Sequence, residues 1–420
     1  MINNVINNVK FKIRHNSALN GRIKLIEDYY ALSDTNIENL KNQTFLQLIK
    51  TAFNNTFYKS YYAEHGVSIS QIKNIEDLSI LPKITKQQVK DNINQIKQHS
   101  FLFKGYTSGT SGAPLVIYRD LNSILNENAY VWWYRTQCGL HWNDKKISLR
   151  GDLGKSKLFI TDKASNTLFI SSFSINKSTF PEILQKITEF KPKALVGYPS
   201  SLAILATFFL ENDKHLNIPL GFTSSETLYP HQEKLIKDAF ETNVFDWYGN
   251  SERTIALYRE NKKYYEPLLY SVNVYKKKCV LTTSLINKAF PLINYEVNDV
   301  ISSSNNYSHS KKSMVIDKIE GRTENYVILS DGSKIGSAAL SLVFKEMDIL
   351  NSQIIQDSAT SLVFNIVPRK KFTDEQELYH KITAKLGGSM NIRINKITEN
   401  DIIYTNSGKF NLVISNIKNS

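Results

Sequence analysis

Cysteine is nearly absent from this chain, which contains only Cys138 and Cys279 among its 420 residues. Two thiols exclude a disulfide framework and a four-thiolate metal site. Cys138 and His141 have the spacing of two metal ligands, but ordinary packing is the commoner role of such a pair. Glycine and proline are also scarce, with 17 and 10 residues, so we expect folded structure along nearly the whole chain.

Long hydrophobic runs are absent as well. Residues 1–17 lack the uninterrupted apolar run of a signal peptide. The most apolar later segment, residues 194–210, is interrupted by Gly197, Pro199 and neighbouring serines. The sequence therefore predicts a cytoplasmic protein without a membrane span.

Acidic residues are outnumbered, because 52 Lys and Arg stand against 39 Asp and Glu, which gives a net charge of +13. Such an excess suits an anionic partner, for example a nucleotide, a nucleic acid, an anionic sugar or a membrane surface. The basic residues are dispersed, with only short clusters at 276–278, 311–312 and 369–371. Nucleic-acid binding, which would weaken steeply with salt, is therefore the least favoured of these partners.

The order of the expected elements indicates an α/β fold. Residues up to about 98 have the apolar spacing of helices. Between residues 100 and 255, strands alternate with helices, and this pattern predicts a layered sheet with mostly parallel strands. The segment 226–240 is expected to be one of these helices, and the polar segment 302–313 a loop.

A change of pattern near residue 319 predicts a domain boundary. Beyond it, strands at 353–356 and 362–367, a helix ending before Gly387 and a strand at 392–398 predict a small α+β module of ferredoxin-like order. A chain of 420 residues is also longer than one ordinary core needs. We therefore expect a large domain of residues 1–318 and a small, mobile domain of residues 319–420.

A stretch rich in hydroxyl groups and glycine is a candidate phosphate site. It consists of Thr107, Ser108, Gly109, Thr110, Ser111 and Gly112. Hydroxyl groups and exposed N–H groups can bind phosphate oxygens, and glycines let the backbone come close. The stretch is not a P-loop, because no Gly-Lys-Ser/Thr follows at the required spacing. Taken alone, such a stretch is more often an ordinary turn.

Five further motifs follow this loop in order. They are Phe222 to Leu228, Asp246 to Glu252, Ala289 to Asp299, Gly321-Arg322, and Ser407-Gly408-Lys409. Together with Tyr106 to Pro114, the set resembles the adenylate-forming superfamily, and in particular its branch of phenylacetate-CoA ligase and CapK-type capsule-biosynthesis proteins. The resemblance covers residues 75–415, and six motifs in family order are fairly specific.

The resemblance implies an enzyme that uses ATP and Mg²⁺ to activate a carboxylic acid. The large domain would bind ATP and the acid, and the small domain would be a lid that carries the catalytic lysine. The residues implied in nucleotide binding are Thr107, Ser108, Gly109, Thr110, Ser111, Gly112, Ser225, Glu226, Trp247, Tyr248, Gly249, Asp299 and Arg322. The residues implied in catalysis are Lys409, Glu252 and Thr107, and Glu252 is also the implied metal ligand.

Individual roles also follow from the resemblance. Tyr248 would stack on adenine, Asp299 would accept hydrogen bonds from the ribose hydroxyls, and Arg322 would add a contact there. Lys409 would neutralise charge between the acid and the α-phosphate. Outside this context the same residue types are a core aromatic, members of surface ion pairs and a solvated turn lysine.

Three departures from the family pattern leave an alternative open. Ala113 stands where many members have lysine, Asn298 replaces a glycine, and Asn294 occupies a position that is often arginine. A non-catalytic nucleotide-binding relative is compatible with these departures, and it would bind ATP without turnover.

The acceptor of the acyl group has two candidates. Glu226 to His231 and Ala289 to Leu292 are more similar to the CapK-type proteins, for which an amine acceptor and an amide product suit surface-polysaccharide or secondary-metabolite biosynthesis. Relatives of the phenylacetate-CoA ligase type use the thiol of coenzyme A instead. Candidates for the wall of the acid pocket are Trp132, Trp133, His141 and Tyr198.

The role of Lys409 gives a first prediction. Lys409→Ala should slow adenylation by several kcal/mol of activation free energy, because it removes a positive charge from the transition state. The measurement is the exchange of labelled pyrophosphate into ATP. Unchanged exchange in this variant would contradict the assignment.

Overall fold

The structure of the protein is a computed structural model. It describes residues 17–99, 102–107, 115–150, 153, 157–322, 326–330, 334–336, 340–344, 347–369, 372, 374–386, 390–404 and 410–417. Among these residues, no helix is both long and apolar enough to cross a membrane.

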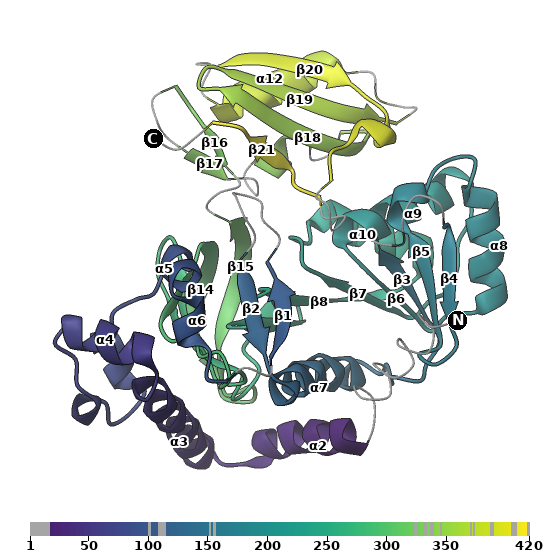
Figure 1. The fold of residues 1–420 in the computed structure, drawn as a ribbon. Helices are drawn as coiled ribbons and strands as arrows, with labels where there is room; N and C mark the ends of the chain where they lie inside the picture. Colours follow the sequence, from purple (N-terminus) through teal and green to yellow (C-terminus); the bar gives the residue numbers. More distant parts are fainter. Residues whose placement is uncertain are drawn as a thin grey trace.

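The first part of the described chain is helical (Figure 1). Its helices are α2 (Ser17–Ala31), α3 (Asp34–Phe53), α4 (Thr56–Glu64), α5 (Lys86–Asp91) and α6 (Ile93–Ile96). Side chains that cap the first turn explain where two of these helices, α3 and α5, begin. The Ser33 side chain accepts a hydrogen bond from the backbone N of Asn36, and Thr85 and Gln88 form a capping box at α5.

A ten-stranded sheet forms the centre of the molecule. Its strands lie in the order β14-β15-β10-β9-β8-β7-β6-β3-β5-β4. The five strands from β8 to β5 are parallel to one another, as expected, and the strands on both sides of this block pair antiparallel. The strand bounds are β3 (Lys146–Arg150), β4 (Phe159–Asp162), β5 (Thr167–Ser171), β6 (Ala194–Gly197), β7 (Leu220–Ser224), β8 (Asn243–Gly249), β9 (Ala256–Glu260), β10 (Lys263–Tyr265), β14 (Asp299–Ser308) and β15 (Ser313–Arg322).

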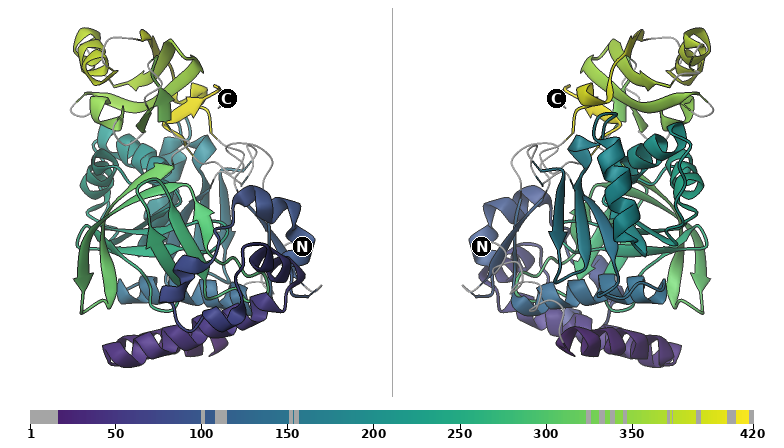
Figure 2. Two further views of the ribbon diagram at one scale, coloured as in Figure 1. Left: turned by 90° about the vertical axis from the view of Figure 1, so that its left-hand side faces the viewer. Right: turned by 90° about the vertical axis from the view of Figure 1, so that its right-hand side faces the viewer.

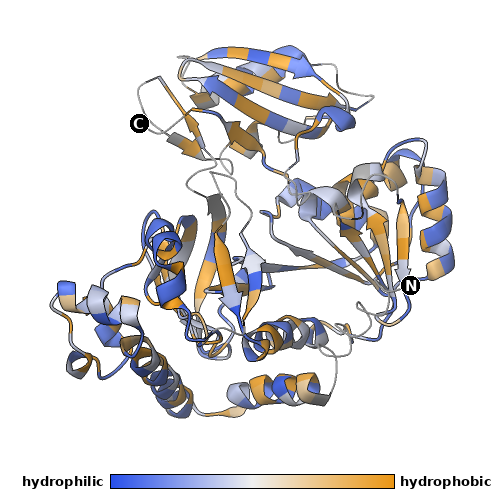
Figure 3. Ribbon diagram, in the orientation of Figure 1, coloured by the Kyte–Doolittle hydropathy of each residue, from blue (hydrophilic) through white to orange (hydrophobic). Residues whose placement is uncertain are grey.

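Helices cover both faces of the parallel block. On one face, α8 (Phe180–Phe190), α9 (Pro199–Glu211) and α10 (Pro230–Phe240) share an apolar core with β3, β5 and β6. On the other face, α2 and α7 (Leu121–Gln137) share a core with β6, β7 and β9. Both cores take apolar residues from the central strands, and Figure 3 shows orange segments beside paler ones in this part of the sheet.

Two expectations about local structure were wrong. The helix expected at 226–240 begins only at Pro230, because residues 225–229 form a loop that opens with Ser225 in the left-handed region at φ 71°. The segment 302–313 is not a loop, because β14 and β15 form a hairpin that includes most of it. Its polar residues sit on strands near the margin of the sheet, where a side chain need not be apolar.

Two smaller sheets connect the helical start to the centre. The strands β1 (Phe103–Tyr106) and β2 (Val116–Arg119) form a hairpin, and β11 (Ser271–Tyr275), β12 (Val280–Ser284) and β13 (Tyr295–Val297) form a three-stranded sheet. Residues of α3 to α6 share one core with both sheets. In this core the buried hydroxyl of Tyr58 donates a hydrogen bond to the carbonyl of Pro291 at 2.7 Å.

The remaining elements, here called the C-terminal unit, lie above the end of the large sheet in all three views (Figures 1 and 2). They are β16 (Tyr326–Ile328), β17 (Lys334–Gly336), a 3₁₀ turn (Ser341–Phe344), β18 (Ile349–Ser358), β19 (Ser361–Pro368), α12 (Glu375–Leu386), β20 (Asn391–Lys396) and β21 (Val413–Ser415). Four strands form a sheet in the order β20-β19-β18-β21, and this α+β unit has its own apolar core. The strand β15 continues to Arg322, so residue 319 lies within it, and the division into two domains stays a prediction.

Asn294, one of the departures from the family pattern, has a structural role that predicts a cost of mutation. It is buried, with φ 51°, and its amide nitrogen Nδ2 donates to the carbonyl of Leu81 at 2.7 Å. Asn294→Ala should lower the free energy of unfolding by about 2–4 kcal/mol, because it leaves a buried carbonyl unpaired and because alanine tolerates the left-handed region less well than asparagine. Chemical denaturation measures this loss.

Asn294→Gly separates the two causes. Glycine tolerates positive φ, so in this variant the free energy of unfolding should fall only by the contribution of the lost hydrogen bond. Equal stability of both variants and the wild type would contradict the assignment.

Candidate active site

A pocket of about 830 Å³ lies at the carboxyl ends of the central strands. Segments far apart in the sequence line it, namely one face of α7, the loop after β7, the end of β8, the start of β14 and residues 410–412 of the C-terminal unit. Open α/β sheets commonly bind ligands outside the carboxyl ends of their strands, and this volume is in the range of small-molecule sites.

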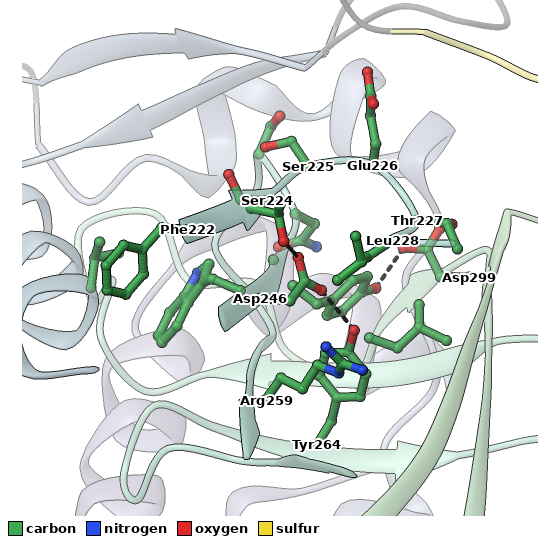
Figure 4. Close-up of a pocket in the computed structure, with 18 of the residues that line it drawn as sticks. Phe222, Ser224, Ser225, Glu226, Thr227, Leu228, Asp246, Arg259, Tyr264 and Asp299 are labelled. Carbon is green, nitrogen blue, oxygen red and sulfur yellow. Dashed lines mark hydrogen bonds between the residues drawn. The ribbon is translucent and has the colours of Figure 1, made fainter. Parts of the chain in front are cut away.

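Buried Asp246 holds the floor of the pocket together (Figure 4). Its Oδ1 accepts a hydrogen bond from the Thr223 hydroxyl at 2.5 Å, and its Oδ2 accepts one from the Tyr264 hydroxyl at 2.7 Å. These bonds join β7, β8 and β10. Burial raises the pKa of Asp246, and the two hydroxyl donors oppose that shift by stabilising the carboxylate.

Tyr248 and Asp299 meet in this pocket, as the resemblance implied for an adenine and ribose site. The Tyr248 hydroxyl donates to Asp299 Oδ2 at 2.5 Å, which ties the end of β8 to the start of β14. Arg322 is the cross-strand partner of Asp299 in the hairpin of β14 and β15. Trp247 and Gly249 also line the pocket, and a β-carbon at Gly249 would approach the Trp247 ring nitrogen to 3.3 Å.

Glu226 connects the pocket to the C-terminal unit. Its Oε2 accepts a hydrogen bond from the backbone N of Ser200 at 3.2 Å, in the first turn of α9. Its Oε1 accepts a hydrogen bond from the backbone N of Phe410 at 2.7 Å. A carboxylate is stabilised at a helix N-terminus, so Glu226 is well placed to fix residue 410 against the large sheet. Ser225 precedes it and lines the same pocket.

One more hydrogen bond joins the C-terminal unit to α9, and a charge of the unit acts on a residue of α10. Arg369 donates through Nη2 to the Thr207 hydroxyl at 3.3 Å. His231 is close enough to Arg369 to be affected by its charge, and burial, with that charge as a smaller cause, lowers the pKa of His231 to about 4. The unit is therefore held by several polar contacts.

The described part of the phosphate loop is its base. The buried Thr107 hydroxyl accepts a hydrogen bond from the backbone N of Leu115 at 2.9 Å, and the backbone N of Thr107 donates to the carbonyl of Leu115 at 3.0 Å. This pair closes the loop directly after Gly105 and Tyr106, which line the pocket. Ser108, Gly109, Thr110, Ser111 and Gly112 lie outside the described residues.

Glu252 lies between Ser251 and Arg253, which both line the pocket, but it is not itself a lining residue. It is buried, and its Oε1 accepts a hydrogen bond from the Tyr295 hydroxyl at 3.0 Å. Among the described residues, no cluster of three or more His, Cys, Asp or Glu side chains could hold a metal. A single carboxylate is a ligand type that Mg²⁺ accepts beside phosphates, and the role of Glu252 as a metal ligand stays a prediction.

Lys409 lies outside the described residues, whereas its neighbour Phe410 lines the pocket. The candidates for the acid wall were wrong. Trp132 and His141 line a separate groove beside α2, and Trp133 stacks on Tyr30 with ring centroids 5.0 Å apart. Tyr198 is the N-cap residue of α9 and does not line the pocket.

The sequence reasoning missed the face of α7 that does line the pocket. Its residues are Glu127, Val131, Tyr134 and Arg135. Their spacing of i, i+4, i+7 and i+8 places them on one helical face, but their mixed polarity does not single this face out in the sequence.

The structure shares its fold with 2-hydroxyisobutyryl-CoA ligase. A crystal structure of that ligase in the postadenylation state with R3-HIB-AMP matches with a TM-score of 0.71 at 16% identity, covering 90% of this chain and 89% of that chain. Its structure with 2-HIB-AMP and CoA in the thioesterification state gives 0.56 at 17% identity, with 90% and 89% covered. The predicted α/β fold of adenylate-forming enzymes is therefore confirmed.

Comparisons of the sequence show which adenylate-forming relatives this chain resembles. Residues 327–416 match the family model of the CapK C-terminal domain. Over 406 residues the chain is 24% identical to Protein CapK of Staphylococcus aureus, with 91% of this chain and 89% of that protein covered. The resemblance to CapK-type proteins is confirmed, and most of the C-terminal unit is similar to the CapK C-terminal domain.

The contacts of Glu226 predict the behaviour of a variant. Glu226→Ala should speed amide hydrogen exchange at Phe410 and at the first turn of α9, because each lost bond to a charged acceptor contributes about 1.5–3 kcal/mol. Glu233→Ala is the matched control, since Glu233 pairs with Arg259 and Lys237 within the large part of the molecule. Unchanged protection at Phe410 in Glu226→Ala would contradict the assignment.

Proposed function

We propose that this protein is an ATP-dependent, AMP-forming carboxylate ligase. An oxygen of the acid attacks the α-phosphorus of ATP, the bond from that phosphorus to the bridging oxygen breaks, and pyrophosphate leaves. The acyl-adenylate then passes its acyl group to a nucleophile. The observation that carries the proposal is the convergence of four separate motif segments, which include Tyr106, Glu226, Tyr248 and Asp299, on one pocket that Phe410 also lines.

The Asp299 end of the pocket suits the nucleotide. The aromatic ring of Tyr248 offers a stacking surface for adenine, and its hydroxyl orients the Asp299 carboxylate toward a pair of ribose hydroxyls. Arg322, opposite Asp299 on the next strand, would add a contact there. The loop that starts at Thr107 would bind the phosphates through its hydroxyl and backbone N–H groups.

Charge neutralisation is the main task at the phosphates. Mg²⁺, held by Glu252, would act as a Lewis acid on phosphate oxygens. Phe410, which directly follows Lys409 in the sequence, is bound through its backbone by Glu226 beside the pocket. This position supports a role for the lysine ammonium in stabilising the charge that develops when pyrophosphate leaves.

The arrangement of the C-terminal unit favours the first half-reaction. The chain resembles the postadenylation state of 2-hydroxyisobutyryl-CoA ligase more than its thioesterification state, with TM-scores of 0.71 and 0.56. We infer that acyl transfer follows a rotation of the C-terminal unit near residues 320–324.

For the second half-reaction we propose an amine acceptor and an amide product, in the setting of surface-polysaccharide or secondary-metabolite biosynthesis. The match to Protein CapK along 91% of this chain supports this choice. Coenzyme A is the alternative acceptor, because the structural neighbour is a CoA ligase. A mass measurement on reactions with ATP, acid and either acceptor separates an amide from a thioester.

Pyrophosphate exchange into ATP tests the first half-reaction. We expect exchange that depends on both Mg²⁺ and an added carboxylic acid, surveyed over aliphatic, aryl and uronic acids. Binding of ATP without exchange for any acid would favour a non-catalytic nucleotide-binding protein and would contradict the proposal.

A further inference from the structure

The acid end of the pocket contains a positive charge that has no ion-pair partner among the described residues. Arg135, on the pocket face of α7, lies with its guanidinium 5.0 Å from the ring centroid of Trp132 and 5.8 Å from that of Phe222. Within the described chain, its side chain forms no ion pair with a carboxylate. The aromatic rings supply only a weak electrostatic partner.

Neighbouring cations increase the imbalance. Burial, and next the charge of Arg150, lower the pKa of Arg135 to about 10. Lys146 lies 5.5 Å from the Trp132 ring centroid, and it donates hydrogen bonds to the carbonyls of Trp142, Asp144 and Ser165. An uncompensated charge in a partly buried position is unfavourable for folding, and binding of an anion would offset that cost.

Arg135 lies at the end of the pocket opposite to the nucleotide side. Figure 4 shows Phe222 and Asp299 on opposite sides of the pocket, with Asp246 between them. Since Arg135 contacts Phe222, it is at the Phe222 end. An acid whose reacting carboxylate points toward the nucleotide would extend its other end toward Arg135.

The remaining lining residues define what lies between these ends. Val131, Tyr134, Val196, Phe222 and Trp247 give the acid side apolar and aromatic walls. Glu127 is on the same face of α7, eight residues before Arg135 and so about 12 Å away along the helix axis. Its negative charge disfavours a second anion at that position and thereby directs it to Arg135.

We propose that the acid substrate carries a second anionic group, remote from the reacting carboxylate, and that Arg135 binds it. This inference rests on the proposed function and deepens it by naming the substrate class, an acid with an apolar middle and an anionic far end. A carboxylate suits the planar guanidinium best, because two parallel N–H donors can bind its two oxygens. A phosphonate or phosphate offers the same charge in a different shape.

The test compares acids matched in length, each as the dicarboxylic acid and as its monoamide, together with acids that end in a phosphonate. The readout is kcat/KM for pyrophosphate exchange into ATP. Wild-type protein should prefer the anionic over the amide end by roughly tenfold to a hundredfold. Arg135→Gln should remove this preference while it retains exchange with the amide-ended acids.

Two further measurements separate recognition from a structural role. Arg150→Gln removes a neighbouring charge that stacks on Phe169 outside the pocket lining, so it should keep the preference. Arg135→Gln without ligand should melt at the same or a higher temperature than wild type, because it removes an unbalanced charge. The preferred dicarboxylic acid should raise the melting temperature of wild type but not of Arg135→Gln.

The outcomes are distinct. A preference for phosphonate-ended acids that Arg135→Gln removes supports the anionic end and assigns it to phosphate chemistry. Two results overturn the inference and leave the proposed function intact. One is equal exchange with the dicarboxylic acids and their monoamides in wild type. The other is an equal loss of kcat/KM for both kinds of acid in Arg135→Gln. Absence of exchange with every acid overturns the proposed function and the inference with it.

Discussion

The carboxylate of Glu226 is the contact on which the arrangement of the site depends. It accepts one backbone N–H from the start of α9 and one from Phe410 of the C-terminal unit. Because both partners are backbone groups, they fix the path of the chain and not only a side chain. A single carboxylate thus fixes the residue that directly follows the implied catalytic lysine in the sequence.

The pocket itself is divided by chemistry. Toward β14, the Tyr248 hydroxyl donates a short hydrogen bond to Asp299. Beside this pair, Asp246 joins three strands of the sheet through the hydrogen bonds that it accepts. Toward α7 the walls are aromatic and aliphatic, with Arg135 at the far end. This division matches a reaction in which a polar nucleotide and a largely apolar acid must meet at one phosphorus atom.

The sequence predicted the α/β layering because strands alternate with helices between residues 100 and 255. It could not predict the strands within 302–313, whose polar residues resemble a loop until the partner strand is known. The start of α10 was placed too early because Glu226 is a good helix residue, whereas its contacts with Ser200 and Phe410 come from distant segments.

The residues of the candidate site were also only partly predictable from the sequence. Motif order identified Tyr248 and Asp299, which the pocket brings together, whereas aromatic content alone selected Trp132 and His141, which line another groove. Arg135 was missed because its importance depends on the absence of a counter-charge among the described residues, and this is a property of three-dimensional packing.

The most direct measurement of the central claim is mass spectrometry on rapidly quenched mixtures of protein, ATP, Mg²⁺ and candidate acids. Formation of an acyl-adenylate together with one equivalent of pyrophosphate is the result that the account predicts. Release of ADP and phosphate in place of pyrophosphate, or bound ATP that stays unchanged with every acid, would contradict it.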